Sequence, residues 1–293
     1  MNNYYQNQRS TPMEELKRFF RSGSNLSLLI LANIGVWLLV QVLKVLVFLF
    51  NSPDPGIAVT WVIHYFALPA DPAALIERPW TLVTYMFLHE EIWHILFNMI
   101  WLYGFGRIFM EYIAGRKLLT VYLLGGISGG LFYVLAFNLF PRFSSVIPLS
   151  FALGASAAVM AIVTAISFYV PDYSLRLLFF GNVRIVYMAI LLFVSDFFMI
   201  PAGNAGGHIA HIGGAIFGFV YAQILKNPPR VSNFSHESDN SVHQRPVSDE
   251  EYNYQKQEKQ RRIDEILEKI SKGGYDSLTR DEKEYLFRTS GKR

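Results

Sequence analysis

Two stretches of this chain are long, apolar and free of Asp, Glu, Lys and Arg: Leu118–Phe140 and Val146–Val170. A helix needs about 20 apolar residues to cross the hydrocarbon core of a bilayer, and a third stretch, Gly203–Leu225, also meets that length. Inside a bilayer every backbone polar group must be bonded within the segment, which makes a helix the natural form for such runs. We therefore predict an all-α membrane protein.

Three further segments reach the length of a span but contain charged residues. Leu26–Phe50 includes Lys44, Tyr85–Gly106 has two acidic residues near its start, and Ile185–Pro201 includes Asp196. Together the six segments predict a six-transmembrane helical bundle. The first is too long for a removable signal peptide and lacks a small-residue cleavage site, so we expect it to remain as an anchor.

Charge is distributed unevenly along the chain. Hydrophobic residues make up 52% and charged residues only 17%, and 26 of the 49 charges lie in residues 230–293. The rest of the chain has too few charges to give so much apolar mass a water-soluble surface, whereas its end is typical of a soluble tail. The absence of cysteine excludes a disulfide framework, and the small net charge of +3 argues against a nucleic-acid partner.

The tail contains two helix starts of the capping-box type, Ser248 with Glu251 and Thr279 with Glu282. Apolar residues recur at helical spacing after the first start, and a pair of glycines then interrupts them. These features predict a small cytoplasmic helical hairpin, for which we expect a cytoplasmic partner. The predicted organisation is a cytoplasmic N-terminal segment (1–26), a six-span domain (27–227), a linker (228–247) and the helical tail (248–293).

Lys and Arg concentrate in alternate short loops, which sets the direction of insertion. They lie before the first span, between the second and third, between the fourth and fifth, and after the sixth, while the intervening loops have few. Both termini are therefore predicted to be cytoplasmic, with the long loop of residues 51–84 on the outer side. Since no eukaryotic-type targeting segment is recognised, the expected location is a bacterial plasma (inner) membrane.

Polar groups inside a membrane span are costly and usually functional, and four such residues lie in the second, fourth and sixth predicted spans at a similar depth. His94 and Asn98 are four apart in the second span and so share a helix face. Ser156 lies in the fourth span and His211 in the sixth. These three spans run in the same direction. At about 1.5 Å per residue, the serine and both histidines lie roughly 6–12 Å inside the same, outer face.

This set contains the parts of an acyl-transfer site. Serine is unreactive at neutral pH without a base in hydrogen-bond reach, and imidazole suits that role. Taken alone, Ser156 would more often bond a backbone carbonyl one turn back, and a single histidine would more often be a packing residue. Their common depth favours a catalytic pair, with His94 and Asn98 as oxyanion donors rather than interhelical hydrogen bonds. Small residues such as Ala157 and Gly214 would let the fourth and sixth spans approach closely.

Short motifs surround these residues: Pro79–Thr84, His89, His94–Asn98, Phe105–Gly106, Glu111, Gly115, Gly154–Ser156 and Ala210–Gly214. In combination they resemble those of the rhomboid family of intramembrane serine proteases, over about residues 27–227. The resemblance implies that Ser156 is the nucleophile and His211 the general base, a dyad without a carboxylate. It also implies that His94, Asn98 and the backbone N–H of Ser156 stabilise the oxyanion, and that the fifth span gates lateral entry of a substrate helix.

Three positions depart from the family pattern. The usual second glycine of the Gly-x-Ser-Gly motif is Ala157, which tightens packing but removes no catalytic group. The tyrosine found four residues after the serine in better-known members is Met160, a flexible side chain able to contact an imidazole. The Trp-Arg pair of the first loop is Trp80 and Thr81, so the usual anchor of that loop is not expected.

A zinc site is the competing interpretation of the histidines. His89 and His94 are five apart, about 140° around a helix, so they do not converge on one ion as a His-Glu-x-x-His motif requires. His208 and His211 could pair at a metal, but the only carboxylate near that depth is Asp196. We therefore expect neither a metal nor a cofactor. Asp196 is assigned no catalytic part, and His208 is expected to line the mouth of the pocket.

The predicted function is a serine endopeptidase that cleaves single-span membrane proteins near the outer face of the membrane. Its expected partners are transmembrane protein substrates and membrane lipid. The alternative is a catalytically inactive rhomboid-like pseudoprotease that binds or chaperones membrane helices. Such relatives typically lose the serine or the histidine, and both are present here. A transporter is a weaker alternative, since the spans have few charges outside the site and no obvious inverted repeat.

Overall fold

The computed structural model of this chain describes residues 11–50, 56–177 and 181–227, together with parts of 261–283. The chain forms two compact units, Met1–Arg230 and Val231–Arg293. The first is predominantly helical, and the second is helical over much of what is described. The predicted linker (228–247) and the capping pair of Ser248 and Glu251 lie outside the described residues.

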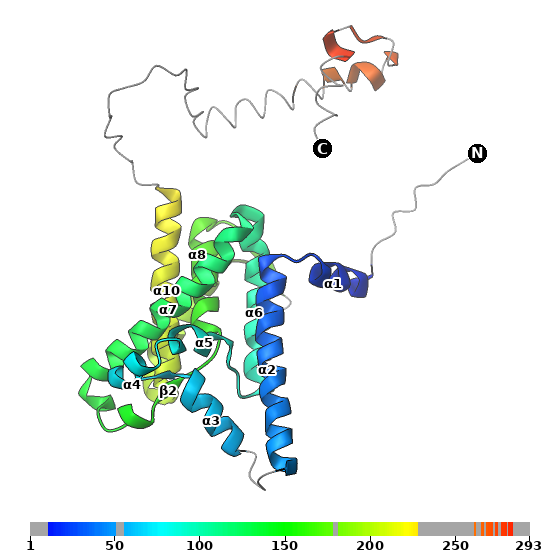
Figure 1. Ribbon diagram of the computed structural model, residues 1–293. Helices are drawn as coiled ribbons and strands as arrows, with labels where there is room; N and C mark the ends of the chain where they lie inside the picture. Colours follow the sequence, from blue (N-terminus) through cyan, green and yellow to red (C-terminus); the bar gives the residue numbers. More distant parts are fainter. Residues whose placement is uncertain are drawn as a thin grey trace, which may run out of the picture. The chain divides into compact units, whose positions relative to one another are not determined.

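The first unit is a bundle built around α8, which packs against α6, α7, α9 and α10, while α2 packs against α6 and α7. Figure 1 shows the long helices of this bundle, with the short helices α3, α4 and α5 near one end. The elements are α1 (Pro12–Arg21), α2 (Asn25–Phe50), α3 (Gly56–Phe66), β1 (Leu68–Pro69), α4 (Pro72–Glu77), α5 (Thr81–Thr84), α6 (Ile92–Tyr112), α7 (Gly115–Leu139), β2 (Phe151–Ala152), α8 (Ser156–Tyr169), β3 (Ser174–Leu177), β4 (Gly181–Arg184), α9 (Ile185–Met199) and α10 (Ala205–Lys226).

Four helices of the described chain are long and apolar enough to cross a membrane: α2, α7, α9 with the turn that follows it, and α10. The prediction of a mostly α-helical fold with membrane-length apolar helices is therefore confirmed. The helix α6 has 21 residues but carries His94 and Asn98 in its apolar run, and α8 has only 14 residues. At 1.5 Å per residue α8 is about 21 Å long, shorter than the hydrocarbon core of about 30 Å. The count of six spans stays a prediction.

Two of the predicted spans begin later in the structure than in the sequence analysis. Residues 146–155 of the predicted fourth span form a 3₁₀ turn, β2 and a loop, so α8 begins only at Ser156. Gly154 has a φ of 120°, a conformation that no helical residue adopts. In the predicted second span, Tyr85–Phe87 is a 3₁₀ turn and α6 begins at Ile92. The apolar run is real in both cases, but hydropathy alone does not show where a helix starts.

The sequence analysis did not predict the helix α1 or the hairpin of β3 and β4. The helix α1 begins with a capping box between Thr11 and Glu14, and its Phe19 ring contacts the edge of Tyr103 on α6 at 5.1 Å between centroids. Between α8 and α9, β3 and β4 form an antiparallel hairpin. The hairpin pairs Leu175 with Val183, so the chain enters α9 from a hydrogen-bonded strand.

The described part of the predicted long loop, residues 56–84, contains α3, α4 and α5 and is anchored by hydrogen bonds. The indole N–H of Trp80 donates to the carbonyl of Tyr65 at 2.8 Å, and the hydroxyl of Thr84 donates to the carbonyl of Phe66 at 2.7 Å. Thr81 is fully buried and donates its hydroxyl to the carbonyl of Arg78 at 2.7 Å. Backbone-directed hydrogen bonds therefore hold this segment although Thr81 replaces the arginine of the family pattern.

The helix α8 lies at backbone contact with α7 and α10. A Cβ placed on Gly214 of α10 would lie 2.1 Å from the carbonyl oxygen of Ala157, and one on Gly218 would lie 2.3 Å from that of Ala161. A Cβ on Gly129 of α7 would lie 2.6 Å from the Cβ of Ala157. The prediction of small-residue packing faces is confirmed, and it places the start of α8 within a few ångströms of both neighbours.

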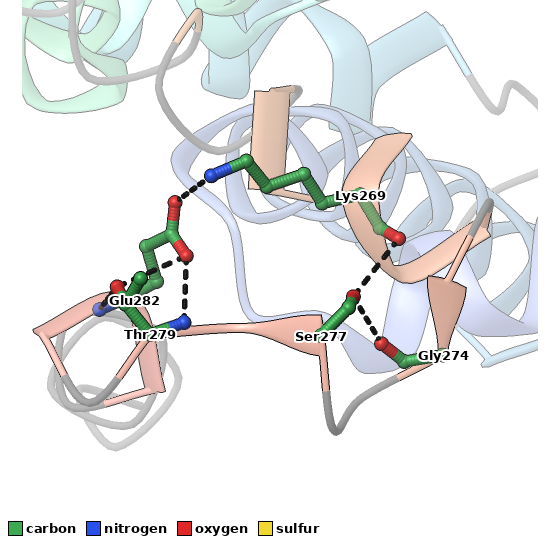
Figure 2. Close-up of polar contacts among 5 residues, drawn as sticks. All are labelled: Lys269, Gly274, Ser277, Thr279 and Glu282. Carbon is green, nitrogen blue, oxygen red and sulfur yellow. Dashed lines mark hydrogen bonds and ion pairs between the residues drawn. The ribbon is translucent and has the colours of Figure 1, made fainter.

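The second unit contains one of the two predicted capping pairs, Thr279 with Glu282. The backbone N–H of Thr279 donates to the carboxylate of Glu282 at 2.9 Å, and the N–H of Glu282 donates to the Thr279 hydroxyl at 3.3 Å. Figure 2 shows the same carboxylate bonded to Lys269, so the cap is tied to the preceding helical residues. Gly274, with a φ of 77°, ends that stretch, as the glycine pair predicted. Ile266 and Leu278 are buried within this unit.

We predict that Gly214→Ala lowers the free energy of unfolding by about 1–3 kcal/mol, because the added methyl group would collide with the backbone of α8. Gly104→Ala on α6 is the matched control, since a Cβ there has nothing within 4 Å; its effect should stay within about 1 kcal/mol. Unfolding by SDS titration in mixed micelles measures both. Equal stability of the two variants would contradict the packing described for α8.

We predict that the second unit loses order in acid through Glu282. Hydrogen bonds from Lys269 and then from Thr279 lower the pKa of Glu282 from 4.5 to about 2. A lowered pKa in the folded state means that the stabilisation is complete above about pH 4.5 and is lost as the pH falls towards 2. Hydrogen-exchange protection of the Thr279 and Glu282 amides in the full chain should fall over that range. Glu282→Gln should show low protection that does not change with pH.

Candidate active site

One cavity of about 1400 Å³ contains all four of the predicted site residues. It is formed mainly by α6, α8 and α10 and by the loops that lead into them, with a contribution from α9. Its lining includes His94, Asn98, Ser156, Met160, Asp196 and His211. The hydroxyl, the amide and both imidazoles therefore line the walls of a single space.

The four residues meet because three neighbouring helices present their N-terminal parts to the same region. His94 is the third residue of α6, Ser156 is the first of α8 and His211 is the seventh of α10. The helix α8 packs against both of the others. Ser156, at the very start of α8, therefore lies in the same region as His94 and His211, which come in the first and second turns of their own helices.

Gly154 allows the loop before Ser156 to pass close to His94. Its φ of 120° is open only to glycine without strain, and its N–H donates to the carbonyl of Tyr85 at 2.9 Å. A Cβ at this position would lie 2.9 Å from Nε2 of His94 and 3.7 Å from Oγ of Ser156. The imidazole and the hydroxyl therefore face one another across this glycine.

Two hydrogen-bond donors of the cavity residues have no partner within their own helix. As the first residue of α8, Ser156 has a backbone N–H that the helix itself does not use. Asn98 is buried, and one of its amide N–H groups donates to the carbonyl of His94 at 2.9 Å. That bond fixes the amide and leaves its second N–H for another acceptor. Both residues line the same cavity.

His89 has a structural part that the sequence analysis missed. Its Nε2 accepts the backbone N–H of Ala155 at 3.4 Å, and its Nδ1 lies 3.4 Å from the carbonyl of Phe87. The helical spacing used to compare His89 with His94 does not apply, because His89 precedes α6. The two rings meet edge to face at 5.1 Å, and the prediction that they do not share a metal ion stays a prediction. A histidine in an extended loop is not bound by helical geometry.

The base candidate has a carboxylate partner that the sequence analysis did not assign. Oδ1 of Asp196, on α9, lies 2.9 Å from Nδ1 of His211 and 2.8 Å from Nδ1 of His208. Asp196 is 8% exposed. The sequence analysis predicted neither contact, and the roles that it gave to His211 and His208 stay predictions.

The same three residues could hold a metal ion, since their ligand atoms all lie within 4.8 Å of one another. The contacts of 2.8 and 2.9 Å are the usual length of an N–H···O hydrogen bond. Ligands about 2.0–2.2 Å from a tetrahedral zinc ion would be separated by well over 3 Å. The observed geometry is that of two imidazole N–H groups donating to one carboxylate oxygen.

The two family departures near the serine are both buried. Ala157 is 1% exposed; its methyl group fits because Gly129 has no side chain, and its backbone carbonyl fits because Gly214 has none. Met160 is also buried and lines the same cavity as His211. Among the described hydrogen bonds none joins Ser156 Oγ to His211, so these two line one cavity without direct contact. Catalytic hydrogen bonds are often long before substrate is bound.

Comparison with known proteins gives matches for both units. Residues 77–228 match the rhomboid domain family, and residues 248–292 match a family of unknown function (DUF6576). RHOMBOID-like protein 12, mitochondrial, of Arabidopsis thaliana is 35% identical over half of this chain and 46% of its own length. Rhomboid protein 1, mitochondrial, of Saccharomyces cerevisiae is 25% identical over 46% of this chain and 38% of its own length. Rhomboid protease GlpG of Haemophilus influenzae is 26% identical over 66% of this chain and 93% of its own length.

The comparisons bear on the predicted location as well. The chain spans less than half the length of the Arabidopsis and yeast relatives. The expectation of a bacterial plasma (inner) membrane is contradicted, because both of these relatives are mitochondrial by name. That expectation rested on a targeting segment not being recognised, which is weaker grounds than similarity to organellar proteins.

We predict that Gly154→Ala destabilises the protein by about 1–3 kcal/mol, because alanine is strained at a φ of 120° and its methyl group would press on the His94 ring. Thermal unfolding in detergent measures the effect. Gly35→Ala on α2, where a Cβ meets nothing within 4 Å, controls for the change of residue type. A Gly154→Ala protein as stable as the Gly35→Ala protein would contradict the geometry described for this loop.

Proposed function

The chain belongs to the rhomboid family, and on that premise we propose that it is an intramembrane serine endopeptidase. The observation that carries the proposal is a single cavity with Ser156 at the start of α8 and His211 on the adjacent α10. A hydroxyl needs a neighbouring base to act as a nucleophile, and imidazole is the side chain suited to that role near neutral pH.

In the proposed reaction, Ser156 Oγ attacks the carbonyl carbon of the scissile peptide while His211 accepts the hydroxyl proton. The carbonyl oxygen becomes an oxyanion that accepts hydrogen bonds from His94, from the second amide N–H of Asn98 and from the backbone N–H of Ser156. His211 then gives its proton to the leaving amine as the C–N bond breaks. A water molecule, activated by the same imidazole, hydrolyses the acyl-enzyme and restores the serine.

The substrate class follows from the surroundings of the cavity. In this proposal α2 and α6 to α10 cross the bilayer, and the substrate is a single-span membrane protein that approaches through the lipid. Cleavage requires an extended backbone, so the substrate helix must unwind near the membrane face that carries residues 51–84. The short α8 supports this arrangement, because its first residue, Ser156, is half-buried and lines the cavity.

The alternative of an inactive rhomboid-like protein that only binds membrane helices is a distinct outcome of the same test. Ser156 and His211 both line the cavity, and a protein that only binds helices would need neither the hydroxyl nor the imidazole. Relatives named as mitochondrial rhomboid-like proteins and a relative named as a protease both match this chain. Direct measurement of cleavage therefore decides between the two.

We predict that the full chain in lipid vesicles cleaves a generic single-span substrate, and that Ser156→Ala and His211→Ala each reduce cleavage at least 10³-fold. Ser167→Ala is the matched control, since this buried serine lies on the same helix and should leave cleavage within about twofold. A fluorophosphonate probe should label the wild type and the Ser167→Ala protein but not Ser156→Ala. Wild-type cleavage by Ser156→Ala would disprove the nucleophile, and failure of both cleavage and labelling in the wild type would favour the inactive alternative.

A further inference from the structure

We propose that Asp196 is a positioning residue that orients His211 for proton transfer, so that the site works as a Ser-His-Asp system rather than as a dyad. The inference rests on the proposed function, because it concerns how the base of that reaction is held. It starts from one contact, the 2.9 Å separation between Oδ1 of Asp196 and Nδ1 of His211.

Asp196 is buried on a helix that is otherwise largely exposed. Most residues of α9 are exposed, and the buried ones in this helix are Ile185, Ala189 and Asp196. A carboxylate in an apolar helix is costly unless it is hydrogen-bonded. Asp196 is therefore turned towards α10 for its hydrogen bonds and not for apolar packing, and both of its recorded partners are imidazoles.

The contact with Asp196 selects one tautomer of the His211 ring. An ionised carboxylate only accepts hydrogen bonds, so the proton in the contact must be on Nδ1 of His211. In the neutral ring Nε2 is then unprotonated and can accept the proton of Ser156. Without the carboxylate the ring could rotate or carry its proton on Nε2, and in either case it could not act as the base.

His208 is bonded to the same carboxylate of Asp196. It lies three residues before His211 and so shares a face of α10, and its Nδ1 donates to the same oxygen of Asp196 at 2.8 Å. Two donors from α10 hold the carboxylate between them. His208 thus supports Asp196, and its loss should leave the contact between Asp196 and His211 in place.

A purely structural link between α9 and α10 is the competing explanation of these contacts. It predicts lower stability when Asp196 is changed, with kcat and KM altered together or not at all. A positioning role predicts a fall in kcat with KM and stability nearly unchanged, together with a change in the protonation pattern of the His211 ring. Asparagine separates the two, because it keeps the size of the side chain and one acceptor oxygen but can present an N–H to the ring.

The test uses the full chain in lipid vesicles with Asp196→Asn, Asp196→Glu and His208→Gln. We expect Asp196→Asn to lower kcat roughly 10²–10⁴-fold with KM within about threefold. Asp196→Glu should recover at least tenfold of the loss relative to Asn, and His208→Gln should cost less than about tenfold. Thermal unfolding of each variant should stay close to wild type, which separates orientation from folding.

A spectroscopic measurement tests the orientation without relying on cleavage. In a sample labelled with ¹⁵N-histidine, His211 should carry its proton on Nδ1, with the signal assigned by its disappearance in His211→Ala. Asp196→Asn should remove or shift that signal, whereas His208→Gln should keep it. An unchanged signal in Asp196→Asn, or wild-type kcat in that variant, would overturn the positioning role.

The two proposals fail in different ways. If the wild type cleaves and Asp196→Asn cleaves equally well, the positioning role is wrong and the endopeptidase proposal stands. If the wild type does not cleave and is not labelled at Ser156, the endopeptidase proposal is wrong. The histidine spectrum then still decides whether Asp196 fixes the ring, since it reports on the contact and not on turnover.

Discussion

The approach of α8 to α7 and α10 is close enough for backbone atoms and methyl groups to touch, and the geometry of the cavity depends on it. Gly129 and Gly214 leave the space that the first turn of α8 occupies. Because Ser156 begins that turn and His211 lies one turn before Gly214 on α10, the spacing between hydroxyl and imidazole is set by backbone contact. Flexible side chains contribute little to it, which suits a site that must keep fixed distances within a fluid bilayer.

Several polar groups in and beside the cavity are held by hydrogen bonds. Asn98 bonds the carbonyl of His94, His89 accepts from Ala155, and His211 is bonded to Asp196. Each bond satisfies a group that would otherwise be costly in an apolar setting. The Ser156 hydroxyl lies in the same space and has no hydrogen bond among the described residues, and neither has the hydroxyl of Tyr133.

Much of this arrangement was predictable from the sequence, and the exceptions have physical reasons. The apolar runs, the meeting of His94, Ser156 and His211 in one region and the small-residue faces follow from composition and residue spacing. The start of α8 did not, because the glycine at position 154 acts through its φ angle and not through its polarity. The contact of Asp196 depends on how α9 is rotated about its own axis, and a helix exposed on most of its surface has no hydrophobic face that reveals this rotation.

The fit of Ala157 into the gap left by Gly129 also has an evolutionary consequence. The methyl group of Ala157 lies 2.6 Å from the place where a Cβ of residue 129 would be, so the two positions share one small volume. A Cβ at residue 129 would also lie 2.6 Å from the carbonyl oxygen of Ala210, so a smaller residue at position 157 would not make room for it. Across related sequences that keep this helix packing, glycine should therefore persist at position 129 whichever small residue stands at position 157.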